Sequence, residues 1–344
     1  MRPYIRRDQR PGPDRAATRT ASRITGSVAT VARRAARPLD RYGFPFRSPT
    51  VPRGVVVPPE ASGLGPDYDT EWARRPLPTV VRGVLTDVPM RIATDIVTRP
   101  RITGHDRLID LQRLDDPPPL IFAPTHHSHL DTALVIRSVP AAWRHKLIVA
   151  AAADYFFDKR WKATLSALAL NAIPIDREAA GRKSADLLRE LIGDGFSLVI
   201  YPEGGRSPDG WGQPFKGGAA YLASRTGAPV VPMFIDGTGA IFGKGMKRPR
   251  AGRTTVVFGH PITAGEDEST RHLNTRIEAA TAALGDESLT DYWSALRRAA
   301  DGTSPSLTGP AYEGWRRDWA LGERRKLGTA GVRRPQSRAW PNLG

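Results

Sequence analysis

Cysteine is absent from this sequence of 344 residues. Its absence excludes disulfide bonds, cysteine-ligated zinc and a cysteine nucleophile, and it suits a reducing compartment. Long hydrophobic runs are also missing: the longest covers only residues 147–153, whereas a helix needs ~20 apolar residues to cross a bilayer. The arginines near the start precede no hydrophobic stretch of the kind found in a secretory signal. We therefore expect a cytoplasmic protein whose membrane contact is peripheral.

The net charge of +16 is concentrated in the two terminal segments. Residues 1–60 contain 13 arginines and four acidic residues, a net charge of +9, and residues 311–344 carry +5. The 250 residues between them hold 30 basic and 28 acidic side chains, so the central part is almost neutral. Basic tails bind phosphate on lipid headgroups as well as on nucleic acid, and they also keep a protein soluble. Because the charge avoids the central part, we expect an anionic membrane surface as a partner and no nucleic acid.

The chain divides into three parts. Residues 1–70 are rich in arginine and proline and lack a periodic hydrophobic pattern, so they are predicted to be a disordered tail. Residues 71–285 alternate short hydrophobic runs with helical segments, which predicts an α/β domain built on a single mixed, largely parallel sheet flanked by helices. Residues 286–344 form a basic extension that contains tryptophan. The predicted strands cover residues 120–123, 146–150, 172–175, 197–201, 230–235 and 254–258.

Several helices can be placed from hydrophobic spacing. One leads the domain between residues 79 and 96, with a kink expected at Pro89. Its hydrophobic stripe is expected to face the core, and contact with a membrane is the alternative. Two more helices should end near Gly195 and Gly227, where glycine suits a C-terminal cap. The stripe of the leading helix consists of Val81, Val84, Leu85, Val88 and Ile92.

Aromatic and basic residues alternate in the C-terminal extension. Tyr312, Trp315 and Trp319 recur at helical spacing among several arginines. Aromatic residues beside arginines are typical of a helix at a membrane interface. Docking of this segment onto the domain explains the pattern equally well.

Three of the seven histidines lie within the segment Thr125-His126-His127-Ser128-His129-Leu130-Asp131. The segment follows a predicted strand and enters a predicted helix, the position at which open α/β sheets bind their ligands. Ser128 is expected to cap that helix, which places Asp131 in its first turn. From there the carboxylate can orient one imidazole nitrogen of His126 and leave the other free to take a proton from a hydroxyl. His126 and Asp131 are therefore the candidate catalytic pair.

The same segment has a second interpretation. His127, His129 and Asp131 match the HxHxD pattern of metallo-β-lactamase-like hydrolases, in which two histidines and an aspartate bind zinc. In that family another histidine usually follows the aspartate, whereas Thr132 stands here. These residues alone leave a proton-transfer site and a zinc site both open.

Two arginines at strand ends favour the proton-transfer site. The segment Tyr201-Pro202-Glu203-Gly204-Gly205-Arg206-Ser207 follows one strand, and Arg177 follows another. Glycines let backbone N–H groups approach a bound anion, and the arginine fork fits a phosphate. A histidine base beside these groups predicts a pocket for a phosphorylated acceptor with a hydroxyl to activate. A zinc hydrolase gives the arginines no role.

Four segments in order resemble the motifs of the 1-acylglycerol-3-phosphate acyltransferase family, over roughly residues 80–285. Residues 125–131 are similar to its NHxSxxD motif, with Thr125 in place of asparagine, and residues 172–177 resemble its second motif. Residues 201–207 resemble its FPEGTRS motif, with Tyr201 for phenylalanine and Gly205 for threonine. Val230-Val231-Pro232 resembles its fourth motif.

The resemblance implies an O-acyltransferase of phospholipid biosynthesis. It implies transfer of a fatty acyl group from acyl-CoA or acyl-carrier protein to the hydroxyl of lysophosphatidic acid, with no metal or other cofactor. It implies that Arg177, Glu203, Gly204, Gly205 and Arg206 hold the acceptor phosphate, whereas Pro232 lies on the acyl-donor side. The departures at Asn171 and Gly205 leave another phospholipid or glycolipid open as the acceptor. The expected location is the inner face of the membrane.

Overall fold

The computed structural model describes residues 63–176, 182–207, 209–243 and 246–309. Its centre is a sheet of seven strands in the order β1-β7-β6-β2-β5-β3-β4. Every neighbouring pair is parallel except β6 and β7, which are antiparallel. The prediction of a single mixed, largely parallel sheet is thus confirmed. The strands are β1 Pro100–Thr103, β2 Ile121–Pro124, β3 Leu147–Ala152, β4 Ala172–Ile175, β5 Ser197–Val199, β6 Val230–Asp236 and β7 Thr254–Phe258.

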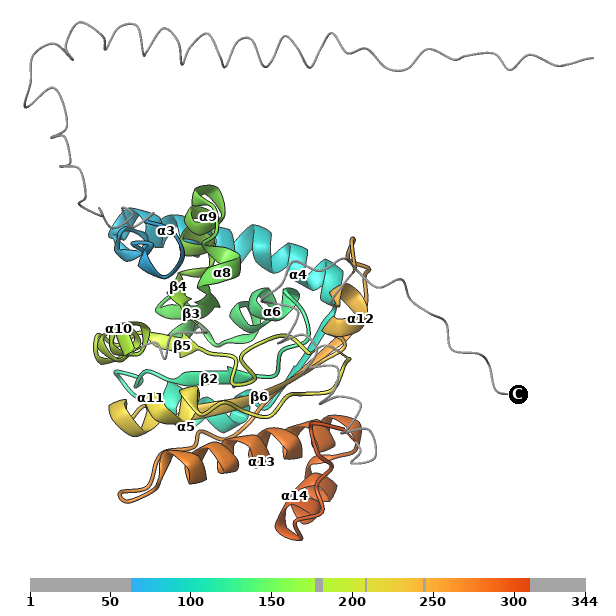
Figure 1. Ribbon diagram of the computed structural model, residues 1–344. Coiled ribbons are helices and arrows are strands. Elements are labelled where there is room, and N and C mark those ends of the chain that lie inside the picture. Colours follow the sequence, from blue (N-terminus) through green and yellow to red (C-terminus); the bar gives the residue numbers. More distant parts are fainter. Residues whose placement is uncertain (1–62, 177–181, 208, 244–245, 310–344) are drawn as a thin grey trace, which may run out of the picture. The chain divides into compact units, whose positions relative to one another are not determined.

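Helices cover both faces of the sheet, and each face has its own hydrophobic core. One core joins side chains of β2 and β5 to the helices α10, α11 and α13. The other joins the opposite faces of the same strands to α6 and α7. In Figure 1, α11 and α13 lie below the sheet and α6 lies above it. The helices named so far are α6 Leu130–Ser138, α7 Ala141–Arg144, α10 Arg182–Gly193, α11 Gly218–Thr226 and α13 Thr270–Leu289.

All six predicted strands are present, and the two predicted helix ends are confirmed. Gly195 and Gly227 adopt left-handed φ values of 84° and 72° after α10 and α11, where a side chain would be strained. The strand β1 was not predicted. It is only four residues long, begins with proline and is partly exposed, so it has no clear hydrophobic pattern.

The leading helix is present, but the expectation that its hydrophobic stripe faces the core is wrong. It runs through α3 (Pro76–Leu85), the π-helical turn η4 (Thr86–Met90), which contains Pro89, and α4 (Arg91–Thr98). The stripe faces solvent instead, and the buried side is polar. Polar anchors hold this orientation: Arg82 donates to the carbonyl of Ala73, and Asp87 and Asp95 form ion pairs with Arg144 and Arg137. The buried polar residues are Arg82, Thr86, Thr94 and Thr98.

The folded part extends beyond the expected range of 71–285 at both ends. The backbone N–H of Gly65 donates to the carbonyl of Phe157, and α13 is followed by a further helix, α14. The aromatic residues at 312, 315 and 319 lie outside the described residues. None of the described helices has the length and hydrophobicity that a bilayer span requires. The remaining elements are η2 Gly65–Asp67, η3 Glu71–Arg74, η5 His105–Leu108, α5 Ile109–Gln112, α8 Ala153–Phe156, α9 Arg160–Leu170, α12 Thr238–Phe242 and α14 Tyr292–Ala300.

Candidate active site

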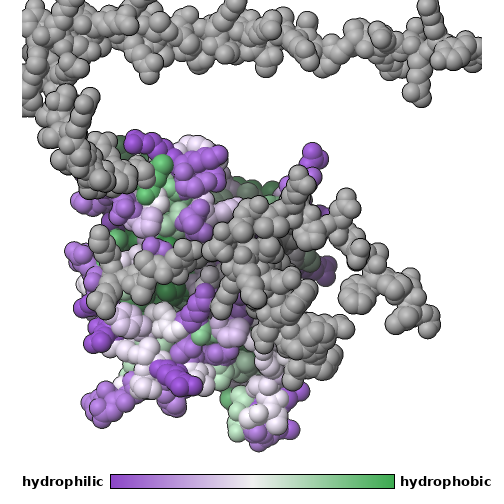
Figure 2. Space-filling model, in the orientation of Figure 1, coloured by the Kyte–Doolittle hydropathy of each residue, from purple (hydrophilic) through white to green (hydrophobic). Residues whose placement is uncertain are grey.

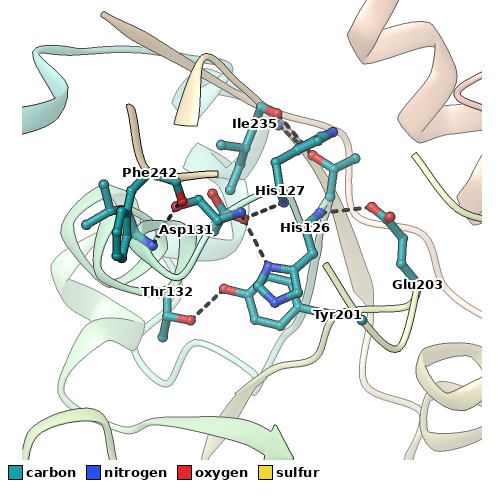
Figure 3. Close-up of polar contacts among 12 residues, drawn as sticks. His126, His127, Asp131, Thr132, Tyr201, Glu203, Ile235 and Phe242 are labelled. Carbon is teal, nitrogen blue, oxygen red and sulfur yellow. Dashed lines mark hydrogen bonds and ion pairs between the residues drawn. The ribbon is translucent and has the colours of Figure 1, made fainter. Parts of the chain in front are cut away.

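His126 and Asp131 form the hydrogen-bonded pair that their spacing predicts. His126 lies in the connection between β2 and α6, and Asp131 lies in the first turn of α6. The Nδ1 atom of His126 is 2.9 Å from Oδ2 of Asp131, which is fully buried (Figure 3). Because Nδ1 is engaged, Nε2 is the ring nitrogen left for a substrate.

The carboxylate of Asp131 is itself fixed by the backbone. The N–H groups of His127 and Ser128 both donate to the same Oδ2 at 2.7 Å. Ser128 Oγ in return accepts from the N–H of Leu130, so the two side chains cap α6 reciprocally. The helix begins at Leu130 with His129 as its N-terminal flanking residue, one position later than predicted, yet the capping contacts are those expected of Ser128 and Asp131.

Tyr201 holds the other side of the imidazole. Its ring stacks on that of His126 with 3.9 Å between centroids, and its hydroxyl is 2.8 Å from Oγ1 of Thr132 (Figure 3). Burial and the nearby charge of Asp131 raise the pKa of the Tyr201 hydroxyl well above its usual range, so it stays neutral. The sequence assigned no role to Tyr201. Its replacement of the family's phenylalanine was the only signal, because the hydroxyl gains a partner only in the fold.

Glu203 joins two loops of the site. Its side chain is buried, Oε1 accepts from the backbone N–H of His126 at 2.8 Å, and Oε2 accepts from that of Gln213 at 2.9 Å. The carboxylate therefore braces backbone around the histidine. Its place among the phosphate ligands, expected from the resemblance, remains a prediction.

Gly204 and Gly205 differ in the space around them. Gly204 has φ of 69°, and an added Cβ would lie 2.7 Å from Nζ of Lys216, whereas a Cβ at Gly205 would meet nothing within 4 Å. Lys216 thus packs across Gly204 and brings an ammonium group to the loop. No role for Lys216 was predicted from the sequence, because this lysine follows the third motif by several residues and only the fold brings it back to the site.

These two glycines provide a matched pair of substitutions. Gly204→Ala should destabilise the protein by about 1 kcal/mol or more and displace Lys216, because left-handed backbone penalises a side chain. Gly205→Ala, in open space, should change stability by less than about 0.5 kcal/mol. Denaturant unfolding of both variants measures the difference. Equal effects would show that the packing at Gly204 is unimportant.

An apolar pocket of about 280 Å³ opens beside His126. The carboxyl ends of the parallel strands β3, β4 and β5 meet at it, as expected for a ligand site in an α/β sheet. The consecutive small residues Ala150, Ala151 and Ala152 make room in its wall, while Gly204, Gly205 and Lys216 supply polar groups. The remaining lining residues are His126, His129, Thr132, Val149, Phe156, Leu170, Ile175, Asp176, Ile200, Tyr201, Pro202 and Gly218.

His129 lies on the aromatic side of this pocket. Its ring stacks on Tyr155 at 4.9 Å between centroids and also contacts Phe156 and Phe242. Burial, with a further contribution from the charge of Arg206, lowers the pKa of His129 to about 4. His129 is therefore neutral at pH 7, and Arg206 is close enough to the pocket for its charge to act there.

The lowered pKa of His129 predicts a loss of stability in acid. An unfolded histidine has a pKa of ~6.5, so the unfolded state binds more protons than the folded state between about pH 6.5 and pH 4. The melting temperature should fall as the pH is lowered through that window. In His129→Gln the fall should be smaller, and a residual fall is expected from His127, whose pKa burial also lowers. Thermal melts of both proteins at pH 7 and pH 4.5 measure this change in melting temperature. An identical change in the unmodified protein and in His129→Gln would contradict the prediction.

The alternative zinc site is not assembled by the side chains. Oδ2 of Asp131 accepts three hydrogen bonds from its own loop, and His129 is stacked within the aromatic group. Within the described ranges, no cluster of three or more histidine, aspartate or glutamate residues could hold a metal ion. The HxHxD interpretation therefore has no support from the geometry.

Among the expected ligand residues that the structure describes, Glu203, Arg206 and Pro232 do not line the pocket. Arg177 lies outside the described residues, and its neighbour Asp176 lines the pocket. Pro232 lies within β6, in register with Ala123 of β2, and is buried. It is absent from the pocket wall, so a direct contact with an acyl donor at this pocket is not supported.

Comparison with known proteins supports the resemblance to acyltransferases. Residues 103–236 match the family model described as Acyltransferase. This segment runs from the end of β1 to the end of β6. It contains His126, Asp131, Tyr201 and the loop with Gly204 and Gly205, here named the glycine loop. The matched segment is therefore similar to an acyltransferase domain.

Relatives narrow the resemblance further. A 1-acyl-sn-glycerol-3-phosphate acyltransferase of Cocos nucifera is 36% identical over 110 residues, covering 30% of this chain and 36% of that protein. A second relative is the chloroplastic 1-acyl-sn-glycerol-3-phosphate acyltransferase BAT2 of Brassica napus. It is 32% identical over 143 residues, covering 40% of this chain and 39% of that protein. The resemblance read from the motifs is thus confirmed, although the chain spans less than two fifths of either relative.

A solved structure is also similar. The 1-acyl-sn-glycerophosphate (LPA) acyltransferase PlsC from Thermotoga maritima matches with a TM-score of 0.48 and 22% identity, covering 65% of this chain and 84% of that one.

Proposed function

We propose that this protein is an O-acyltransferase that moves a fatty acyl group from an acyl thioester to the hydroxyl of lysophosphatidic acid. The observation that carries the proposal is the buried Asp131 bonded to Nδ1 of His126, at the edge of an apolar pocket that also receives Lys216. The relatives' names supply the acceptor. The proposed donor, acyl-CoA or acyl-carrier protein, is the one that the motif resemblance implies.

Proton transfer by His126 is the chemical core of the proposal. Nε2 takes the proton from the acceptor hydroxyl while that oxygen attacks the thioester carbonyl, and Asp131 stabilises the imidazolium. When the tetrahedral intermediate collapses, the C–S bond breaks and the thiolate receives the proton back from Nε2. The new ester bond leaves the enzyme unchanged. Tyr201, stacked on the ring, keeps Nε2 directed at the pocket.

Cations beside the glycine loop suit the acceptor phosphate. Lys216 lines the pocket, and the charge of Arg206 acts on His129 within it. Among the described residues neither side chain has an ion-pair partner, so both charges are free for a ligand. Charge-assisted hydrogen bonds to phosphate are stronger than neutral ones. Arg177 would add a third cation, as the resemblance implies.

The apolar wall of the pocket suits a fatty acyl chain. The strand end at Ala150–Ala152 leaves space between Phe156 and Leu170, and burial of methylene groups there contributes ~0.8 kcal/mol each. No step of the proposed reaction requires a metal or another cofactor. Another phospholipid or a glycolipid stays open as the acceptor, because Gly205 lacks the hydroxyl of the family motif. We place the enzyme at the cytoplasmic face of a membrane, where such acceptors reside.

The test is thioester consumption by the full chain over a panel of acceptors. Lysophosphatidic acid should be acylated fastest from acyl-CoA or acyl-carrier protein, ahead of other lysophospholipids, a monoacylglycerol and a glycolipid. Mass spectrometry should detect the acylated acceptor in equal amount to the free thiol released. Thiol release without acylated product would reveal a thioesterase and overturn the proposal.

The phosphate contacts can be tested separately. Arg206→Gln should raise KM for lysophosphatidic acid by about tenfold or more, because a hydrogen bond to a charged group contributes ~1.5–3 kcal/mol. KM for a monoacylglycerol, which lacks phosphate, should change little. The matched control is Arg271→Gln, an exposed arginine on α13. Equal changes in KM for both acceptors would remove Arg206 from the phosphate site.

A further inference from the structure

A small cavity lies beneath the leading helix, among α3, α6, α7 and α9. Its volume is about 20 Å³, which is room for one particle of roughly the size of a water molecule. It is distinct from the apolar pocket, although Leu170 at the end of α9 lines both. Figure 1 draws α3 and α9 side by side at the top of the domain, and Figure 2 shows hydrophilic and hydrophobic side chains mixed over them. The polar residues that line the cavity are Thr79, Arg82, Thr86, Arg144 and His145.

Arg82 is a buried cation in this lining. Only 6% of its surface is exposed. Its Nη1 donates to the carbonyl of Ala73 at 2.9 Å, and its Nη2 donates to the hydroxyl of Thr79 at 3.2 Å. Both acceptors are neutral, and among the described residues no carboxylate forms an ion pair with the guanidinium. The hydrogen bonds therefore engage N–H groups but leave the positive charge uncompensated.

The neighbouring charges do not remove this excess. Arg144 also lines the cavity, and its Nη1 is 2.9 Å from Oδ1 of Asp87. Nε2 of His145 is 3.6 Å from Oδ2 of the same carboxylate. Asp87 therefore offsets the charge of Arg144, and that of Arg82 remains. Burial, followed by the nearby charge of Arg74, lowers the pKa of the Arg82 guanidinium, and no carboxylate acts to raise it. An arginine nevertheless stays protonated at pH 7.

We infer that this cavity binds one small monovalent anion of the size of chloride. A charge buried without a partner is strongly unfavourable, and a single negative charge balances the one in excess. The guanidinium groups of Arg82 and Arg144 supply N–H donors, which form charge-assisted hydrogen bonds with an anion. The volume excludes sulfate and phosphate. A water molecule fits the space but brings no charge.

The anion would join the leading helix to the rest of the domain. Arg82 belongs to α3 and Arg144 to α7, and both line the one cavity. An ion held between them strengthens this contact in the folded chain. The unfolded chain does not form the site, so the anion should raise the melting temperature in a saturable way. The inference concerns stability and does not depend on the proposed chemistry.

Thermal melts of the full chain in chloride and in gluconate test the site. Gluconate is far too large for the cavity, so at equal ionic strength the two salts differ in the anion that can enter. Replacing gluconate by chloride should raise the melting temperature by about 3 °C or more once chloride exceeds its Kd about tenfold, and the rise should then level off.

Two variants separate the site from general salt effects. Arg82→Met should lose the chloride-dependent rise, because the excess charge is gone. Arg113→Met, which removes an exposed arginine after α5, should retain it. Absence of the rise in the unmodified protein would overturn the inference, and so would equal rises in the two variants.

Bromide can locate the ion directly. Because Arg82→Met also removes two hydrogen bonds, a second measurement on the unmodified protein is needed. Crystals of the full chain soaked in bromide should show an anomalous peak in the cavity, within hydrogen-bond distance of Arg82 and Arg144. Density for water without an anomalous peak would overturn the inference. A carboxylate of the chain itself in the cavity, or bromide only at exposed cations, would do the same.

Discussion

Replacement of His126 by alanine is expected to lower kcat for acyl transfer by about 10²–10⁴-fold, the usual contribution of a general base. Among the described residues, His126 has the only side chain that both hydrogen-bonds to the buried Asp131 and lines the pocket. Its loss should leave KM for the acceptor nearly unchanged, because the proposed phosphate contacts lie on the loop of residues 201–207 and not on His126. Initial rates of thiol release over a range of acceptor concentrations separate the two constants.

The matched control for that variant is His260→Ala, since His260 is exposed and outside the pocket. It should keep full activity. Retention of near-normal kcat in His126→Ala, with the fold intact by circular dichroism, would show that another group removes the proton. The proposed chemistry would then be wrong even if the acceptor were correct.

Asp131→Asn is expected to have a comparably large effect. The amide can place its oxygen towards the backbone N–H groups of His127 and Ser128 or towards His126, but it no longer carries the charge that stabilises the imidazolium. In a serine-protease triad the equivalent change costs about 10⁴-fold, because the histidine adopts the wrong tautomer. We expect a loss in kcat of about 10³-fold or more, measured in the same assay.

Stability must be separated from catalysis in this variant, because Asp131 also caps α6. The control is Asp286→Asn. Asp286 is another buried carboxylate, near the end of α13, and the substitution weakens its ion pair with Arg298 of α14. Both variants should melt at a lower temperature. Only Asp131→Asn should lose activity when assayed well below its melting temperature. Parallel losses of activity in the two would reduce Asp131 to a structural role.

Much of the fold could be predicted because its signals are local. The six strands of the central region are short hydrophobic runs bounded by turn residues, and the ends of α10 and α11 are marked by glycines. The pairing of His126 with Asp131 was also a local prediction, since both lie around one helix start, but the strand-end arginines were needed to favour it over a zinc site. These features depend on residues close together in the sequence.

What could not be predicted depends on contacts across the fold. The stripe from Leu77 to Ile96 has the same periodicity whether it faces a core or a bilayer, and the decision comes from ion pairs with Arg137 and Arg144, about fifty residues later. The contact of Tyr201 with Thr132 spans 69 positions and that of Glu203 with His126 spans 77. Lys216 reaches the site only because Gly204 lacks a side chain.

The two hydrogen bonds that Glu203 accepts affect how a substrate binds to the site. One buried carboxylate ties the backbone of His126 to that of Gln213, so the loop bearing the base and the loop that follows the glycines are preorganised as one body. The entropy of ordering them is lost when the chain folds and not when the ligand arrives. Association should therefore proceed in a single kinetic step, without a slow rearrangement of these loops after encounter. Backbone amides there should exchange with deuterium no faster in the free protein than with acceptor bound.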